Sequence, residues 1–281
     1  MTLLPMDDAL TPGLYIVATP IGNLSDLSPR AAHVLAHADL IAVEDSRVTA
    51  KLLHHIGVKR PMTPYHDHNA DRVRPGLVAR MAGEAVALVS DAGTPLISDP
   101  GYKLVRDARA AGVHIVTIPG PSAVIAALTL AGLPTDRFAF FGFLPVKAKA
   151  RASAIAEAGS FKGTLAFYES GPRLAATLTA LADGLGERYA AIGREISKRF
   201  EETQTGTLAE LAARYAEAAP KGEIVIIVGP PGEAPAASED DLDSALRDAM
   251  TRLSPSRAAA EVAADLGLPR RAVYERAQRL K

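Results

Sequence analysis

The sequence predicts an α/β protein made of two domains and a small helical tail. Short apolar segments alternate with segments of helical length through the first 120 residues, which indicates βαβ units and a mostly parallel sheet. The later strand-like segments include a polar, threonine-containing one at 200–206, which is typical of an edge strand in a mixed sheet. A stretch rich in Pro, Gly and Ala at 230–238 indicates a linker. We therefore expect domains at 1–120, 121–232 and 238–281.

The expected elements follow one another in a regular order. In the first domain, strands are predicted at 14–18, 39–43, 85–89 and 114–118, with a short extended piece after Met62. Helices are predicted between them, near 28–37, 46–55, 70–82 and 101–111. The second domain should begin with a helix at 122–131 and continue with strands at 138–141, 164–168, 188–193, 200–206 and 223–228. The tail should form helices at 240–253, 256–266 and 270–281, in which Gly267–Pro269 makes the turn of a helix-turn-helix.

Composition excludes several classes of protein. The 281 residues contain no cysteine, so disulfides and thiolate metal sites are excluded. The formal net charge is −1, so contact with nucleic acid would require a local basic patch. No apolar run has the length of a membrane span, and residues 1–8 lack the features of a signal peptide, so we expect a cytoplasmic protein.

Three polar loops carry the chemistry of the first domain. They lie at 19–23, 90–101 and 119–123, and each follows a predicted strand and precedes a helix. Because the carboxyl ends of parallel strands lie at one edge of a sheet, we expect the loops to meet there. Their glycines allow close approach of the backbone to a ligand, and their prolines stiffen the turns. The alternative is that these loops are tight turns that bind nothing.

The absence of other motifs reduces the number of candidate ligand classes. No G-x-G-x-x-G follows a strand, and no G-x-x-x-x-G-K-[ST] is present, so neither a common dinucleotide fold nor a P-loop is indicated. No lysine lies in the three loops, which argues against a nucleoside triphosphate. S-adenosylmethionine has the adenosine-like body and modest charge that suit such a site, although spacing alone does not single it out.

Longer motifs show a resemblance to a known family. The chain resembles the tetrapyrrole methylase superfamily, the class III S-adenosylmethionine methyltransferases, over about residues 13 to 229 and again in the terminal helix pair. One mild departure is Ser46, where threonine is expected. The motifs that carry the resemblance are Leu14–Leu24, Val43–Arg47, His66–Asn69, Leu88–Gly101, Pro119–Ala123, Phe167–Ser170 with Arg173, Gly193–Lys198 and Lys221–Glu223.

The resemblance implies a fold, a reaction and a set of contacts. It implies the two-domain tetrapyrrole-methylase fold, a homodimer, and S-adenosylmethionine bound in the cleft between domains. The branch most similar to this chain acts on 16S ribosomal RNA, by 2′-O-methylation of a cytidine ribose in the decoding region of the small subunit. The cofactor contacts that it implies are Thr19, Pro20, Gly22, Asn23, Ser90, Asp91, Ala92, Gly93, Thr94, Pro121, Ser122, Ala123, Phe143 and Tyr168.

Methyl transfer to a ribose also needs a group that assists removal of the hydroxyl proton. Asp45 and Glu44 end the second predicted strand, at the edge of the sheet where the cofactor loops meet, and they are our catalytic candidates. The alternative for Asp45 is the N-cap of the helix that begins at Ser46. For Asp91, the alternative to binding the cofactor is capping of its own loop.

Two groups of cations are candidates for binding RNA. Arg47 and Lys51 lie one helical turn apart, and Arg270, Arg271 and Arg276 belong to the basic terminal helix. A solvated helix face is the alternative for the first pair, and a packing or dimerisation appendage is the alternative for the tail.

Other charged residues fit structural roles. His66 and His68 have the spacing of a metal pair on an extended segment, but no further ligand cluster supports a metal, and we expect none. Ion pairing among the charged residues of the second domain is expected because buried charges must be paired, and Glu223 is interpreted as structural. The residues of this predicted ion-pair lattice are Glu169, Arg173, Arg194 and Glu195.

Two other functions stay open at this point. One is a small-molecule methylase that acts on a tetrapyrrole, for which the basic tail would have no use. The other is an RNA-binding assembly factor without catalytic activity, which would not need intact cofactor loops.

Overall fold

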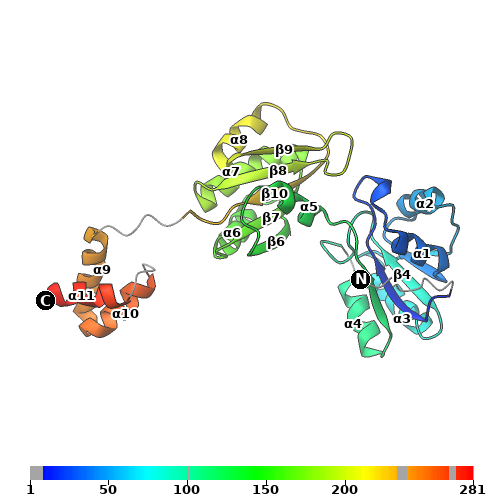
Figure 1. Cartoon of the computed structure of the whole chain (residues 1–281), viewed down its shortest axis with the longest axis horizontal. Helices are drawn as coiled ribbons and strands as arrows, with labels where there is room; N and C mark the ends of the chain where they lie inside the picture. Colours follow the sequence, from blue (N-terminus) through cyan, green and yellow to red (C-terminus); the bar gives the residue numbers. More distant parts are fainter. Residues whose placement is uncertain (1–8, 100, 233–238, 266–269, 281) are drawn as a thin grey trace. The chain divides into compact units, whose positions relative to one another are not determined.

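A computed structural model describes residues 9–99, 101–232, 239–265 and 270–280 of the chain. Its internal contacts divide it into two compact units, one ending at Pro230 and the other beginning at Pro231 (Figure 1). The N-terminal residues 1–8, the predicted turn at 267–269 and most of the predicted linker lie outside the described residues.

The first unit begins with a parallel sheet. Among the described residues this sheet has five strands in the order β3-β2-β4-β1-β5, all parallel. Its central strands are apolar and almost fully buried, as expected for strands that are covered on both faces. The strands are β1 (Gly13–Val17), β2 (Leu40–Val43), β3 (Met62–Pro64), β4 (Ala85–Val89) and β5 (Ile115–Ile118).

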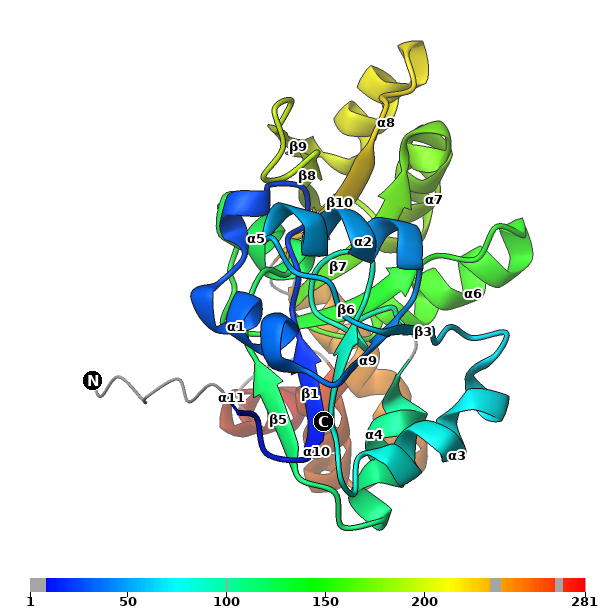
Figure 2. The same ribbon diagram turned by 90° about the vertical axis from the view of Figure 1, so that its right-hand side faces the viewer.

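Helices cover both faces of this sheet (Figure 2). One face packs against α1 (Pro29–His37) and α2 (Ser46–His55), and the other against α3 (Ala70–Arg80) and α4 (Tyr102–Ala110). The short 3-10 helix η1 (Leu24–Asp26) precedes α1. The alternation predicted from the sequence is thus confirmed, and each predicted boundary in this part lies within two residues of the structure.

The second half of the unit contains a mixed sheet. In the part of the chain that is described, its strand order is β6-β7-β10-β8-β9, with β6 parallel to β7 and the remaining neighbours antiparallel. The polar strand predicted at 200–206 is an edge strand, as expected, although it begins two residues later. The strands are β6 (Phe138–Phe143), β7 (Thr164–Ser170), β8 (Tyr189–Arg194), β9 (Glu202–Thr207) and β10 (Glu223–Val228).

Helices also enclose this second sheet. The helix α5 (Ala123–Leu130) packs on the face that carries Ala166, Ala191 and Ile227, and three further helices pack on the opposite face. Sequence analysis did not predict those three, which are α6 (Ala148–Gly159), α7 (Leu174–Leu185) and α8 (Leu208–Glu217). A capping box between Thr207 and Glu210 starts α8, and the 3-10 helix η2 (Gly171–Arg173) leads from β7 into α7.

The second unit consists of helices in its described part. They are α9 (Glu239–Arg252), α10 (Pro255–Asp265) and α11 (Arg270–Arg279), which share a core that includes Leu246, Val262 and Val273. Arg276 donates two hydrogen bonds, of 2.6 and 3.0 Å, to the Asp243 carboxylate and so joins α11 to α9. None of the described helices in either unit is both long and apolar enough to cross a bilayer.

Two glycines provide a test of this fold. A methyl group on Gly171 would lie 1.6 Å from the Pro220 carbonyl oxygen, whereas one on Gly76, inside α3, would meet nothing within 4 Å. We predict that Gly171→Ala lowers the free energy of unfolding by roughly 3 kcal/mol or more, because backbone must move. Gly76→Ala should leave stability unchanged or raise it by about 0.5–1 kcal/mol. Urea denaturation measures both, and equal stability of the two variants would contradict the turn geometry at Gly171.

Candidate active site

The three predicted loops do meet at the carboxyl end of the parallel sheet. Thr19 and Gly93 form an isolated antiparallel bridge, in which the backbone nitrogen of each residue lies 2.8 or 3.1 Å from the carbonyl oxygen of the other. The Thr94 hydroxyl donates to the Pro121 carbonyl oxygen at 3.0 Å. Gly93 has φ +80°, a left-handed conformation that a side chain would strain. These bonds hold the loops after β1, β4 and β5 in one rim.

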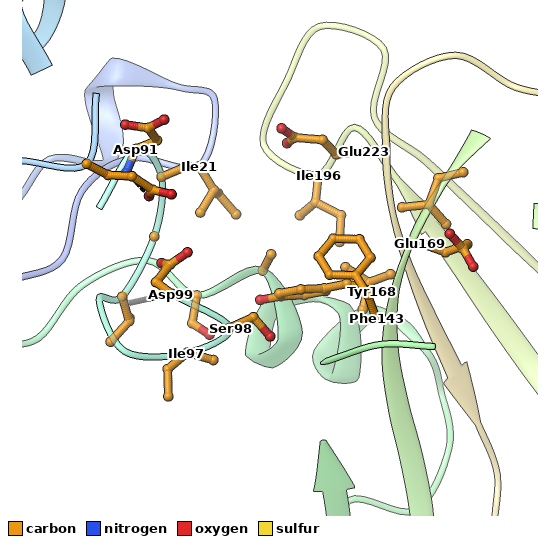
Figure 3. Close-up of a pocket in the computed structure, with 18 residues that line it drawn as sticks. Ile21, Asp91, Ile97, Ser98, Asp99, Phe143, Tyr168, Glu169, Ile196 and Glu223 are labelled. Carbon is orange, nitrogen blue, oxygen red and sulfur yellow. Dashed lines mark hydrogen bonds between the residues drawn. The ribbon is translucent and has the colours of Figure 1, made fainter. Parts of the chain in front are cut away.

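A pocket of about 290 Å³ opens between this rim and the second sheet. Figure 3 shows Ile21, Asp91 and Asp99 on one side and Tyr168, Phe143 and Glu223 on the other. The residues that line the pocket are Ile21, Glu44, Asp91–Thr94, Ile97–Asp99, Ser122, Ala123, Phe143, Tyr168, Glu169, Ile196 and Glu223–Val225.

The rim reaches the second sheet through a bulge in β6. The register of β6 against β7 shifts between Phe140 and Phe143, and Gly142 there has φ +63°. A Cβ on Gly142 would lie 3.0 Å from the Ser98 hydroxyl, so the glycine allows the 90–101 loop to approach the strand closely. The bulge places Phe143 beside Tyr168, with ring centroids 5.6 Å apart. Together these rings supply an apolar, aromatic wall.

The pocket wall is acidic. The described residues that line it include five carboxylates, from Glu44, Asp91, Asp99, Glu169 and Glu223, and no Lys, Arg or His. Burial raises the pKa of Asp99 to about 6 and also raises the pKa of both Asp91 and Glu44. A raised carboxyl pKa means that burial in this wall disfavours the ionised form, and a bound cation would offset this cost. The wall therefore suits a positively charged ligand and repels a polyphosphate.

Most of the predicted cofactor contacts line this pocket. Asp91, Ala92, Gly93 and Thr94 do so from the second loop, and the rest come from Ser122, Ala123, Phe143 and Tyr168. The other predicted contacts do not line it. Thr19 and Ser90 are buried beneath the rim, where Thr19 donates to the Ser90 carbonyl oxygen at 3.4 Å, while Pro20 and Pro121 belong to the same turns. Gly22 and Asn23 lie in a separate hollow with Lys198 and Arg199.

The two acidic residues after β2 have different surroundings. Asp45 does not line the pocket. It is the N-cap of α2, accepts the Arg47 N–H at 2.8 Å and binds the Arg47 guanidinium at 2.6 Å, which lowers the pKa of Asp45 to about 2. Glu44 does line the pocket, and its carboxylate accepts the Asp91 N–H at 3.4 Å. The capping alternative for Asp45 is therefore the arrangement found, and its catalytic role stays a prediction.

The predicted lattice of charged residues is wrong as a single network. Glu169 pairs with Arg173 at 3.3 Å, whereas Arg194 pairs with Glu202 at 2.8 Å and Glu195 pairs with Lys198 at 2.9 Å. The separation follows from the strand order, because β7 and β8 lie on opposite sides of β10. Glu223 binds Lys198 at 2.9 Å, an ion pair that fits its structural interpretation, and it also lines the pocket.

Most of the remaining predicted residues lie at the surface. Arg47 and Lys51 are exposed on α2, and Arg270 and Arg271 are exposed at the start of α11. Among the described residues, His66 and His68 belong to no group of three or more potential metal ligands. His66 packs edge to face with His68, with centroids 6.0 Å apart.

Sequence reasoning missed several residues of the wall. Ile97, Ser98 and Asp99 belong to the second loop, but the resemblance assigned only its first part. Ile196 comes from the loop after β8, and Glu223–Val225 begin β10. A signal existed for all of them, because each lies within one of the motifs that carry the resemblance or directly after it.

Comparison with known proteins identifies the family. The model of the tetrapyrrole (corrin/porphyrin) methylases matches residues 13–212. The chain belongs to this family. It is accordingly an enzyme, a methyltransferase that uses S-adenosylmethionine, and the acidic pocket suits that sulfonium cofactor. A second model, of the RsmI C-terminal HTH domain, matches residues 236–281.

Curated relatives share most of the chain. Proteins named ribosomal RNA small subunit methyltransferase I are 51% identical in Mesorhizobium japonicum, over 97% of this chain and 93% of that protein, and 51% identical in Erythrobacter litoralis, over 98% and 97%. A protein of the same name from Escherichia coli O157:H7 is 45% identical, over 93% of each.

Solved structures share the fold. Diphthine synthase matches with a TM-score of 0.62 at 17% identity, covering 77% of this chain and 89% of that one. Uroporphyrin-III C-methyltransferase from Thermus thermophilus, solved with S-adenosyl homocysteine, matches with a TM-score of 0.53 at 20% identity, covering 77% and 97%. The predicted fold class is confirmed.

A pair of substitutions in two neighbouring loops, after β4 and after β2, tests the pocket. Asp91→Ala removes a carboxylate from the wall, and we predict that the Kd for S-adenosylmethionine rises at least about tenfold, since a hydrogen bond to a charged group contributes roughly 1.5–3 kcal/mol. Asp45→Ala, which changes the neighbouring carboxylate outside the pocket, should leave this Kd within about threefold. Isothermal titration calorimetry measures both. An unchanged affinity in Asp91→Ala would remove this residue from the binding site.

Proposed function

We propose that this chain methylates the 2′ hydroxyl of a cytidine ribose in the decoding region of 16S ribosomal RNA. The observation that carries the proposal is the identity of 51% over nearly the whole chain with proteins named ribosomal RNA small subunit methyltransferase I. The cytidine and its 2′ oxygen rest on the resemblance of the sequence motifs.

The tail supports an RNA substrate over a tetrapyrrole. A fold that modifies a small molecule has no need of a basic helical unit, and this chain carries one whose last helix presents exposed Arg270 and Arg271. Arg271 pairs with Glu275 at 3.1 Å on the same helix and remains 92% exposed. We therefore assign phosphate contacts to Arg270 and Arg271, and to Arg47 and Lys51 on α2.

Arg276 fits a mainly structural role within that unit. Its bonds to Asp243 hold two helices together, so its loss would disturb the tail before it disturbed RNA. We propose the domain boundaries 1–120, 121–232 and 238–281 for the working enzyme. A cytoplasmic location and a homodimer complete the proposal.

The roles proposed for the site follow the pocket wall. Asp91–Thr94, Ser122 and Ala123 would hold the cofactor from the rim, and Phe143 and Tyr168 would cover it from the second sheet. Thr19, Pro20, Ser90 and Pro121 would shape the turns that carry these contacts.

The proposal is tested by mapping ribose methylation. RNA from cells that lack this protein should have lost one 2′-O-methyl group in the decoding region of 16S RNA, and a plasmid copy should restore it. Resistance of the 2′-O-methylated site to alkaline cleavage, read by sequencing, gives the position. Full methylation of the decoding region in the deletion strain would refute the assignment.

Truncation separates the two units. A chain that ends at Pro230 should keep its affinity for S-adenosylmethionine, because every residue of the pocket wall precedes that point. Its affinity for small ribosomal subunits should fall about tenfold or more, and the salt dependence of binding should become shallower as phosphate contacts are lost. Filter binding at several salt concentrations measures this. Equal affinity and equal salt dependence would show that the tail only packs.

A further inference from the structure

The proposed reaction needs a proton acceptor, and Asp45, the first candidate from the sequence, is poorly suited to this role. The hydroxyl of a ribose is a weak acid, so a base near the transferred methyl group would assist its deprotonation. The best-placed acid by sequence, Asp45, is bound to Arg47 and has a pKa of about 2, which makes it a weak base. The acceptor is therefore to be sought among the carboxylates of the pocket wall.

Three of those carboxylates already have partners. Glu169 accepts the Thr177 hydroxyl at 2.6 Å and pairs with Arg173. Glu223 binds the Lys198 ammonium group. Asp91 accepts the Asp45 N–H at 2.9 Å. Each of these three carboxylates is thus already held by a partner from the protein.

The other two differ in how they are held. Glu44 accepts a backbone N–H from the rim, at the long distance of 3.4 Å. Asp99 forms no ion pair within the described residues, and the neighbouring Ser90 hydroxyl donates to the Ala92 carbonyl oxygen at 3.4 Å. Asp99 is half-buried in the pocket wall, on the side opposite Tyr168 (Figure 3).

The backbone just before Asp99 has a strained conformation. Leu96 has φ +75° and Ser98 has φ +62°, and neither is glycine. Left-handed conformations of this kind cost about 1–2 kcal/mol per residue and are found preferentially at functional sites. The two reversals bring three consecutive residues, Ile97, Ser98 and Asp99, to the same wall. An extended chain would point alternate side chains in opposite directions.

We propose that the carboxylate of Asp99 accepts the proton of the ribose hydroxyl during methyl transfer, an assignment that rests on the proposed ribose methylation. In this step the ribose oxygen forms a bond to the methyl carbon as the bond from that carbon to sulfur breaks. The sulfonium becomes a neutral thioether, the hydroxyl proton passes to an Asp99 oxygen, and the acid later returns it to water. Charge and atoms balance without a further reactant.

The surroundings of Asp99 suit this task. Burial raises its pKa to about 6, the Ser90 hydroxyl opposes the shift, and the charges of Glu44, Asp91 and Asp67 add to it. Tyr168 faces it from β7, and burial followed by the charge of Asp99 raises the pKa of this phenol, which stays neutral at pH 7. A carboxyl with a pKa near 6 is a stronger base than an ordinary aspartate and is still mostly ionised at neutral pH.

The direction of the pH dependence follows. Asp99 must be ionised to accept the proton, so the rate of methyl transfer should fall about tenfold per pH unit below pH 6 and level off above it. Bound S-adenosylmethionine is a cation and should lower this midpoint somewhat.

The test compares Asp99→Asn with the full-length wild-type enzyme. Small ribosomal subunits from cells lacking the protein serve as substrate, in single turnovers at saturating S-adenosylmethionine. We expect transfer about 100-fold slower or more, with a Kd for the cofactor within about threefold of wild type. Asp99→Ala should regain part of its rate when formate is added, because formate can replace the missing base. Asp136→Asn, at an exposed site outside the pocket, is the matched control and should keep wild-type rates.

Several results would overturn the assignment. One is transfer by Asp99→Asn at the wild-type rate. A second is a cofactor Kd raised tenfold with an unchanged rate at saturation, which would make Asp99 a binding group. A third is a 100-fold loss in Glu44→Gln with little loss in Asp99→Asn. A wild-type pH profile that is flat between pH 5 and 7 would contradict it without any variant. If the wild-type enzyme transfers no methyl group to a ribose, the proposed function itself fails and this inference fails with it.

Discussion

The structure depends on the bonds that hold three loops in one rim. The Thr19–Gly93 bridge and the hydrogen bond from Thr94 to Pro121 join segments that follow three different strands. Without them, the loops after β1, β4 and β5 would each be a separate turn, and the pocket would lose one of its walls. The parallel sheet makes the arrangement possible, because it places the carboxyl ends of β1, β4 and β5 side by side. The glycine at position 93 allows the backbone to reach its partner.

The charge of the pocket suits the ligand that we propose this rim holds. Five carboxylates face a partly enclosed space, and burial raises the pKa of Asp91, Glu44 and Asp99. An enzyme that uses S-adenosylmethionine benefits from such a wall, since the cofactor carries a sulfonium and an ammonium group. The aromatic rings of Phe143 and Tyr168 supply the apolar side that an adenosine needs. Positioning of the reacting groups then contributes much of the rate, because the methyl donor is already activated.

Sequence reasoning located the rim well and the opposite wall poorly. Loops such as 90–101 follow apolar strands and combine glycine, proline and carboxylates, so their place at the sheet edge follows from local pattern. The second sheet gives no such signal, because the local sequence of each strand does not determine which strands become its neighbours in the sheet. Glu223 shows the difference. It precedes an apolar strand and was interpreted as structural, and only the antiparallel pairing of β10 with β7 places it opposite Ser170 and among the residues that line the pocket. Asp45 shows the converse, since its position at the sheet edge was predicted correctly while its side chain is occupied by the helix that follows.

A crystal structure with S-adenosyl homocysteine bound is the most direct test of this account. We predict that the ligand lies between the Asp91–Thr94 segment and Tyr168, with its amino group within hydrogen-bond distance of a pocket carboxylate. A ligand bound at another surface, with this pocket empty, would contradict it.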